Sequence, residues 1–168
     1  GKFVIYSKDG VVIRRKAAQG VTLFMDSSWH GPGAAARNVL FVPYGAATPS
    51  MFVARGNCIV ANGGILKSSG SSAWDSDAYS LVGYPTCHVQ FKAAQTGSQF
   101  MIGLNSDPTT DQDWTSLDYA WHADVSGQAR IRESGSLISS PATYTTTSLF
   151  AITYDGSNVR YYLDGTLH

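Results

Sequence analysis

The chain has 168 residues, of which 43% are hydrophobic, 12% aromatic and 14% charged, and its formal net charge at pH 7 is zero. This length suits one domain, or one domain with an extension, and the hydrophobic fraction is sufficient for a packed core. The zero net charge argues against nucleic acid as a partner, and no run of apolar residues is long enough to insert into a membrane as a spanning helix.

The charges are divided unevenly along the chain. Residues 1–71 carry eight basic and two acidic side chains, whereas residues 72–168 carry four basic and ten acidic ones. Such a change in charge balance indicates two segments with different roles. We therefore expect a β-rich oligomerising or connecting segment over residues 1–71 and a separate domain over residues 72–168.

The first segment is expected to form short strands that need neighbours. Residues 3–6 are apolar on both faces of a strand, and an Asp9-Gly10 turn follows them. An isolated two-stranded hairpin cannot bury two apolar faces. The pattern therefore predicts a partner, from the same chain or from another subunit, that covers one face, and we expect this extension to form a homotrimer.

The apolar alternation becomes longer and cleaner after Trp74. Alternate residues are apolar in six stretches, which are residues 87–93, 100–104, 117–123, 129–132, 150–154 and 159–163. Turns rich in Gly, Ser, Asp and Asn separate these stretches, and no convincing helix is visible. The spacing predicts an all-β fold, an antiparallel β-sandwich. The two cysteines, Cys58 and Cys87, are too few for a disulfide framework, and we expect buried thiols.

One run of residues resembles a known family. Residues 150–165, which contain two Asp-Gly turns, look like the paired strands of concanavalin A-like (laminin G-like) jelly rolls, and residues 88–108 resemble an earlier strand pair of that family. The resemblance covers about residues 73–168 and implies a jelly roll. Domains of this family are usually longer, so we expect the copy to be incomplete at its C-terminus, with Leu167 and His168 beginning a further strand.

The resemblance also implies a function. Jelly rolls of this kind are frequent in tail fibres and tail-tip proteins of bacteriophages, where they follow trimer-forming segments similar to residues 1–15. It implies a structural and receptor-binding component of the extracellular virion tail, in contact with other tail proteins and with a host cell-surface glycan or outer-membrane protein. The alternative is a laminin G-like or lectin-like carbohydrate-binding module of a secreted adhesin. A glycoside hydrolase on the same fold is a third reading.

Catalytic motifs are not evident in the sequence. A glycosidase uses two carboxyl groups at a defined separation. The chain has a single glutamate, Glu133, which lies beside a turn, and no strand carries aspartates at alternate positions. There is no Gly-x-Ser-x-Gly nucleophile motif either. We therefore expect a protein that is not an enzyme.

The stretch over residues 105–121 is the most unusual part of the sequence. Four aspartates, Asp107, Asp111, Asp113 and Asp118, fall within twelve residues, beside aromatic side chains. The plainest interpretation is a long solvated loop with aspartate turns, in which the aromatic residues of the following strand enter the core.

Two functional interpretations of this loop compete with the plain one. Aromatic rings that stack on sugars, beside side chains that accept hydroxyl hydrogen bonds, would make a ligand site. The candidate ligand-binding residues are Trp114, Asp111, Asp113, Tyr119 and His122, of which Trp114 is expected to be the most exposed. Alternatively, Asp107, Asp111 and Asp113 are a candidate Ca²⁺ site, although their spacing does not match an EF-hand loop.

Overall fold

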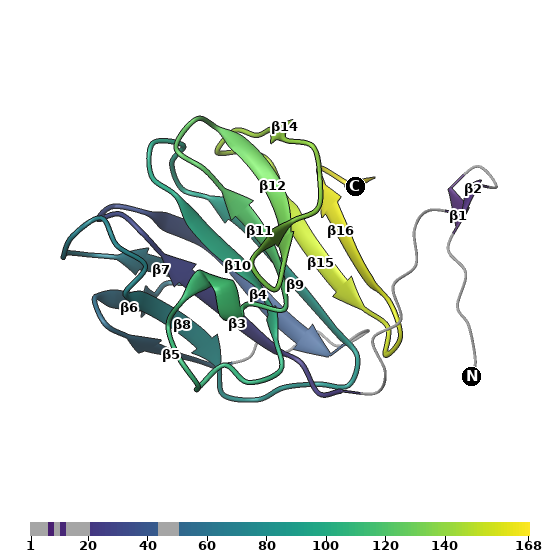
Figure 1. Ribbon diagram of the computed structural model, residues 1–168, viewed down its shortest axis with the longest axis horizontal. Helices are drawn as coiled ribbons and strands as arrows, with labels where there is room; N and C mark the ends of the chain where they lie inside the picture. Colours follow the sequence, from purple (N-terminus) through teal and green to yellow (C-terminus); the bar gives the residue numbers. More distant parts are fainter. Residues whose placement is uncertain (1–6, 9–10, 13–20, 44–50) are drawn as a thin grey trace.

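The computed structural model describes residues 7–8, 11–12, 21–43 and 51–168, and no α-helix occurs among them. β1 (Ser7–Lys8) and β2 (Val11–Val12) pair as a short antiparallel hairpin. The other strands form two antiparallel sheets that face each other (Figure 1). The prediction of an all-β chain built from antiparallel sheets is confirmed.

The larger sheet has eight strands. Across the sheet they are β13 (Ser136–Leu137), β12 (Gln128–Glu133), β11 (Tyr119–Ala123), β10 (Phe100–Asn105), β3 (Phe24–Trp29), β8 (Ser76–Ser80) and β5 (Phe52–Arg55), and β14 (Ala142–Thr143) also pairs with β12. A short 3-10 helix, η1 (Trp114–Ser116), lies in the connection from β10 to β11.

The second sheet has seven strands. Their order is β17 (Thr166–Leu167), β16 (Val159–Leu163), β15 (Phe150–Tyr154), β9 (Cys87–Ala93), β4 (Ala35–Pro43), β7 (Gly64–Lys67) and β6 (Cys58–Ala61). Leu167 lies in a strand, as expected, and β17 is an edge strand. The ring of His168 packs edge-on against Trp121, with ring centroids 5.6 Å apart.

Strand pairing crosses the boundary that the sequence suggests near residue 71. β3 lies between β10 and β8, and β4 lies between β9 and β7. Residues 24–43 therefore supply central strands to both sheets, and the sheets do not divide at residue 71. The apolar strand expected over residues 3–6 falls outside the described residues, as do residues 13–20.

A single main core fills the space between the sheets. Trp29 stacks on Phe100 with ring centroids 4.8 Å apart, and Phe91 stacks on Phe150 at the same separation. Phe91 also meets Phe100 edge to face at 6.0 Å, which joins the two stacks across the sheets. Such aromatic pairs add to the free energy gained by burying their apolar area. The alternation predicted for residues 87–93 is confirmed, since every second side chain of β9 is buried.

The two cysteines are buried and unpaired, as predicted. Burial raises the pKa of both thiols to about 12. Reactive cysteines have a lowered pKa and partial exposure, so these two thiols belong to the packing.

A second, smaller apolar cluster lies on the outer face of the eight-stranded sheet, the face turned away from the seven-stranded sheet. Met101, Leu117 and Ala120 are buried there, beneath Trp74 and Trp114. The alternation over residues 117–123 predicts that Leu117 shares a face with Trp121, and this prediction is wrong, since Trp121 lies in the main core. Leu117 follows η1 instead of lying in β11, so the alternation of β11 does not extend to it.

Candidate functional site

The two tryptophans that pack against the outer cluster also line a pocket. The cavity measures about 170 Å³ and is lined by Trp74, Gln99, Trp114, His122 and Arg132. Trp74 precedes β8 and Gln99 precedes β10, while Trp114 belongs to η1. The other two side chains come from the neighbouring strands β11 and β12. We call this cavity the aromatic pocket.

The two tryptophans of the aromatic pocket are in contact with each other. Their ring centroids are 6.2 Å apart and their planes are inclined by 46°. Trp74 also meets the imidazole of His122 edge-on at 5.9 Å. Neither indole is fully buried, so each keeps part of its surface for a ligand. The expectation that Trp114 is the most exposed candidate is wrong, because Trp114 is half-buried against the outer cluster while Asp111 and Asp113 are exposed. Exposed aromatic surface beside polar groups is typical of small-molecule and sugar sites.

His122 is held by hydrogen bonds on both sides of its ring. The Nε of Arg132 donates to His122 Nδ1 at 3.2 Å, and His122 Nε2 lies 3.2 Å from Gln99 Oε1. Because an arginine can only donate, Nδ1 must be the acceptor and Nε2 must carry the proton. Burial, together with the charge of Arg132, lowers the pKa of His122 to about 4. The imidazole is therefore neutral at physiological pH.

The guanidinium of Arg132 lies over the ring of Trp114. Its guanidinium carbon lies 4.7 Å from the centroid of the ring, a cation–π geometry. Its Nη1 donates to the carbonyl oxygen of Gly135 at 2.8 Å. The aromatic pocket thus has a rigid cation on one wall.

A buried lysine holds Trp74 in place. The Nζ of Lys67 donates to the carbonyl oxygen of Ala73 at 2.8 Å and pairs with the carboxylate of Asp75, the residues on either side of Trp74. It also donates to the carbonyl oxygen of His30 at 3.0 Å. The side chain of Lys67 is fully buried, and a buried charge without such partners would cost several kcal/mol. Trp74 is therefore positioned before any ligand arrives.

The loop over residues 106–118 is tied to the outer face of the sheet by Arg55. This side chain donates to Asp77 through Nε, at 2.9 Å, and to the carbonyl oxygens of Pro108 and Thr109, at 2.8 and 3.1 Å. Ser28 Oγ donates to the carbonyl oxygen of Gln112 at 2.9 Å. In Figure 1 this loop is the segment that contains the short helical turn of η1, and it lies in front of the strands.

Asp26 lies on the same face of the sheet and is buried. It accepts hydrogen bonds from Asn105 Nδ2 at 2.8 Å and from the backbone N–H of Ser27 at 2.7 Å. Burial nevertheless raises the pKa of this carboxyl to about 7. Asp26 does not line the aromatic pocket, so its role is in the fold.

The structure separates the ligand-binding candidates into two groups. Trp114 and His122 line the aromatic pocket. Asp111 and Asp113 do not: Asp111 Oδ1 accepts from the N–H of Asp113, and Asp113 Oδ1 caps η1 by accepting from Thr115, each at 2.8 Å.

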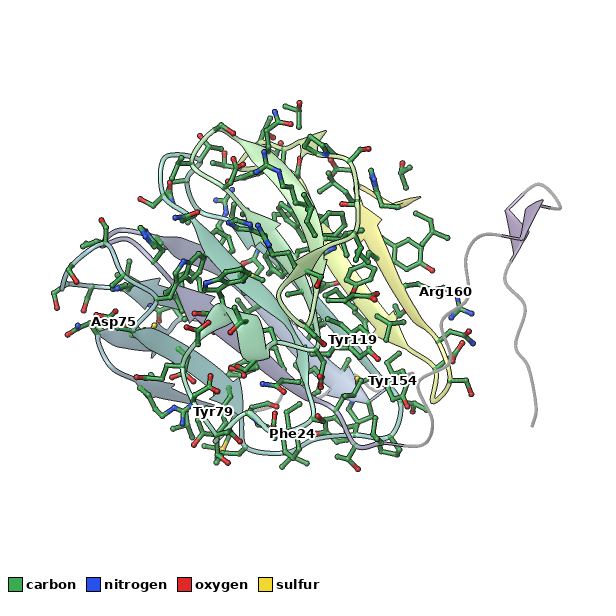
Figure 2. The ribbon with its side chains drawn as sticks, in the orientation of Figure 1. Phe24, Asp75, Tyr79, Tyr119, Tyr154 and Arg160 are labelled. Atoms are coloured by element: carbon green, nitrogen blue, oxygen red, sulfur yellow. The ribbon has the colours of Figure 1, made fainter. Side chains whose placement is uncertain are left out.

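The fifth candidate, Tyr119, points to the other side of the sheet. It packs against the main core and lies near Tyr154, well apart from Asp75, the neighbour of Trp74 in the chain (Figure 2). Tyr119 therefore does not belong to the aromatic pocket.

The three candidate metal ligands do not converge. Asp107 Oδ2 accepts from Thr110 Oγ1 at 3.2 Å, and the carboxylates of Asp111 and Asp113 serve the turn just described. Across the described part of the chain, no group of three or more His, Cys, Asp or Glu side chains is arranged to hold a metal ion.

Three residues of the aromatic pocket were not anticipated from the sequence: Trp74, Gln99 and Arg132. They lie 25 to 58 residues apart along the chain and come together only through sheet pairing. Trp74 lies just before the part of the chain in which the apolar alternation becomes clean. No local pattern distinguishes it from a core tryptophan.

The side chains that line the aromatic pocket supply both apolar surface and hydrogen-bonding groups. Its described lining offers two indoles, an amide, a neutral imidazole and a guanidinium, and no carboxylate. The pair of acids on which glycoside hydrolysis usually depends is thus not present in this lining.

Comparison with known proteins assigns no family to the chain. Neither a family model, nor a curated protein, nor a solved structure matches it. In the described residues there is also no helix with the length and apolar character needed to cross a membrane. Function must therefore be inferred from the pocket and its chemistry.

Proposed function

We propose that this chain is a structural and receptor-binding component of a bacteriophage tail fibre or tail tip, and that its aromatic pocket binds a glycan of the host surface. The resemblance of residues 150–165 to concanavalin A-like jelly rolls supports the tail assignment, and the two facing antiparallel sheets are compatible with that fold. In this proposal the chain acts outside the cell, as part of the virion, and the jelly roll presents the pocket.

The observation that carries glycan binding is the pair of partly exposed tryptophans. Trp74 and Trp114 meet at one cavity with three polar side chains around them. An indole face covers the apolar face of a sugar ring, while amide and guanidinium groups bond to its oxygens. Lys67 and Arg55 hold the segments that carry these rings, which lowers the entropy lost on binding.

The wider assembly is part of the same proposal. Residues 1–20 would join three identical chains and connect the sandwich to other tail proteins. The apolar character of residues 3–6 on both faces of a strand supports such an interface.

A carbohydrate-binding module of a secreted adhesin, laminin G-like or lectin-like, is the second candidate. The aromatic pocket supports it equally, because the pocket indicates the ligand class and not the parent assembly. We propose binding without catalysis in both cases, since the described lining of the pocket holds no carboxylate.

A glycan array tests the binding proposal. The wild-type chain should bind a limited set of glycans, and Trp114→Ala should weaken that binding about tenfold or more, because a central aromatic contact is lost. Trp114→Phe should have an intermediate effect.

Tyr162→Ala is the matched control, since Tyr162 is a partly exposed aromatic residue of β16 outside the pocket. Thermal melting would establish that each variant is folded. A folded wild-type chain that binds no glycan, or equal binding by Trp114→Ala, would refute the proposal.

A further inference from the structure

We propose that the aromatic pocket selects glycans with a carboxylate-bearing sugar, and that the guanidinium of Arg132 binds that carboxylate. This inference rests on the proposed glycan binding and adds the chemical class of the ligand.

The charge of Arg132 is not neutralised within the described residues. Its Nε donates to His122 and its Nη1 to the carbonyl oxygen of Gly135, and both acceptors are uncharged. None of the ion pairs found among the described side chains includes it. The wall of the pocket therefore carries a full positive charge.

Four of the six other basic side chains in the described sandwich are neutralised, whereas Arg37 and Lys92 form no ion pair among the described residues. Four ion pairs join basic side chains to aspartates, namely Arg55–Asp77, Lys67–Asp75, Arg130–Asp124 and Arg160–Asp155. Burial and the neighbouring Arg130 lower the pKa of Arg132, and no carboxylate opposes that effect. A partly buried cation without a counter-ion is costly. An anionic ligand would remove this cost.

The geometry of Arg132 suits a carboxylate. Stacking on Trp114 and two hydrogen bonds fix the guanidinium plane. The Nη2 group donates to no acceptor in the described part of the chain, so its N–H groups remain for a ligand. A planar guanidinium fork matches the two oxygens of a carboxylate better than a lysine would.

The size of the pocket limits what can enter. Its volume of about 170 Å³ is well below the range for drug-sized ligands, roughly 300–1,000 Å³. One sugar ring is therefore the natural occupant. A ring against the indoles of Trp74 and Trp114 would bring a carboxylate substituent to Arg132, on the same wall as Trp114.

The test is an array in which each carboxylated glycan is paired with its carboxyl-reduced counterpart. We expect the wild-type chain to bind the acidic member at least about tenfold more tightly, because hydrogen bonds between a guanidinium and a carboxylate are stronger than those between neutral groups. Arg132→Gln should remove this preference, so that the two members of a pair bind with the same affinity, and thermal melting would establish that this variant is folded. Arg132→Lys should retain part of the preference.

Arg130→Gln is the matched control. It removes the same charge from the same strand, two residues away, but Arg130 is paired with Asp124 and does not line the pocket. This variant should keep the wild-type preference.

Equal binding of acidic and reduced glycans by the wild type would overturn the inference and leave glycan binding intact. A preference that survives in Arg132→Gln would overturn the role of Arg132. Binding to no member of the array would overturn the proposed function itself.

Discussion

At the scale of single residues, the pocket depends on a histidine that stays neutral. His122 accepts a hydrogen bond from Arg132 at Nδ1 and donates one to Gln99 Oε1 from Nε2. A charged imidazole could not accept from Arg132, and the two cations would repel each other. The lowered pKa of His122, about 4, therefore keeps Arg132 in position over the whole physiological range of pH.

Asp26 gives a residue-scale prediction of pH dependence. Burial raises the pKa of this carboxyl from 3.8 to about 7, so between these values the folded chain holds a proton that the unfolded chain has released. The stability that comes from this proton is complete below about pH 4 and is lost as the pH rises through about 7. The asparagine side chain of Asp26→Asn does not titrate, so this variant does not lose stability in this way as the pH rises.

We therefore expect the free energy of unfolding of Asp26→Asn to rise relative to wild type between pH 4 and pH 8. The change should reach about 4 kcal/mol at most, since one pKa unit corresponds to about 1.4 kcal/mol. Urea denaturation of both proteins at pH 4 and pH 8 measures this change. Any effect of the asparagine amide on stability that does not depend on pH cancels when the two pH values are compared. A difference that is the same at pH 4 and pH 8 would contradict the account of Asp26.

At the scale of elements, the loop over residues 106–118 converts an outer sheet face into a site. It brings Trp114 over Met101 and Ala120, and it is tied down through its backbone carbonyls rather than through its aspartates. The aspartates instead hold the internal turns of the loop.

Arg55→Met tests this anchoring. The variant leaves the buried carboxylate of Asp77 without its cation and frees the carbonyls of Pro108 and Thr109. We expect the free energy of unfolding to fall by roughly 2–4 kcal/mol, and amide hydrogen exchange over residues 106–118 to become faster. Arg37→Met is the control, because Arg37 is exposed and forms, within the described part of the chain, one hydrogen bond, to the carbonyl oxygen of Thr146. Unchanged exchange in the loop of Arg55→Met would contradict the anchoring role.

Elements with strict alternation could be predicted from the sequence. Residues 87–93 and 150–154 follow a period of two, because one face of each strand meets the core. The cluster of Met101 and Leu117 could not be predicted in this way. Its burial depends on a loop that folds back, and local periodicity contains no information about that.

The pocket was predictable only in part, for a related reason. Trp114 stood out because it lies in a polar loop, and His122 because it lies on the polar face of a strand. Arg132 also lies on a polar face, but its missing counter-ion becomes visible only when the neighbouring strands are in place. Asp111 and Asp113 form turns and do not line the pocket. The sequence does not distinguish the two roles, since turn formation and ligand binding use the same residue types.

At the scale of the whole molecule, both halves of the sequence build one sandwich. β3 and β4 are central strands, so the change in charge balance near residue 71 does not correspond to a break in the sheets. Sheet order, unlike strand position, depends on contacts between residues far apart in the chain.

The homotrimer proposed for this chain predicts its mass in solution. Light scattering after size exclusion, at micromolar concentration, should give three times the 18.0 kDa of a single chain. Removal of residues 1–20 should lower that mass to that of the monomer. A folded, strictly monomeric full chain would contradict the proposed assembly.

The most direct test of the central claim is a crystal structure of the chain with the glycan that binds it most tightly. We predict a sugar ring against Trp74 and Trp114, with its carboxylate on the guanidinium of Arg132. A glycan bound elsewhere on the sandwich, with the aromatic pocket empty, would contradict the account.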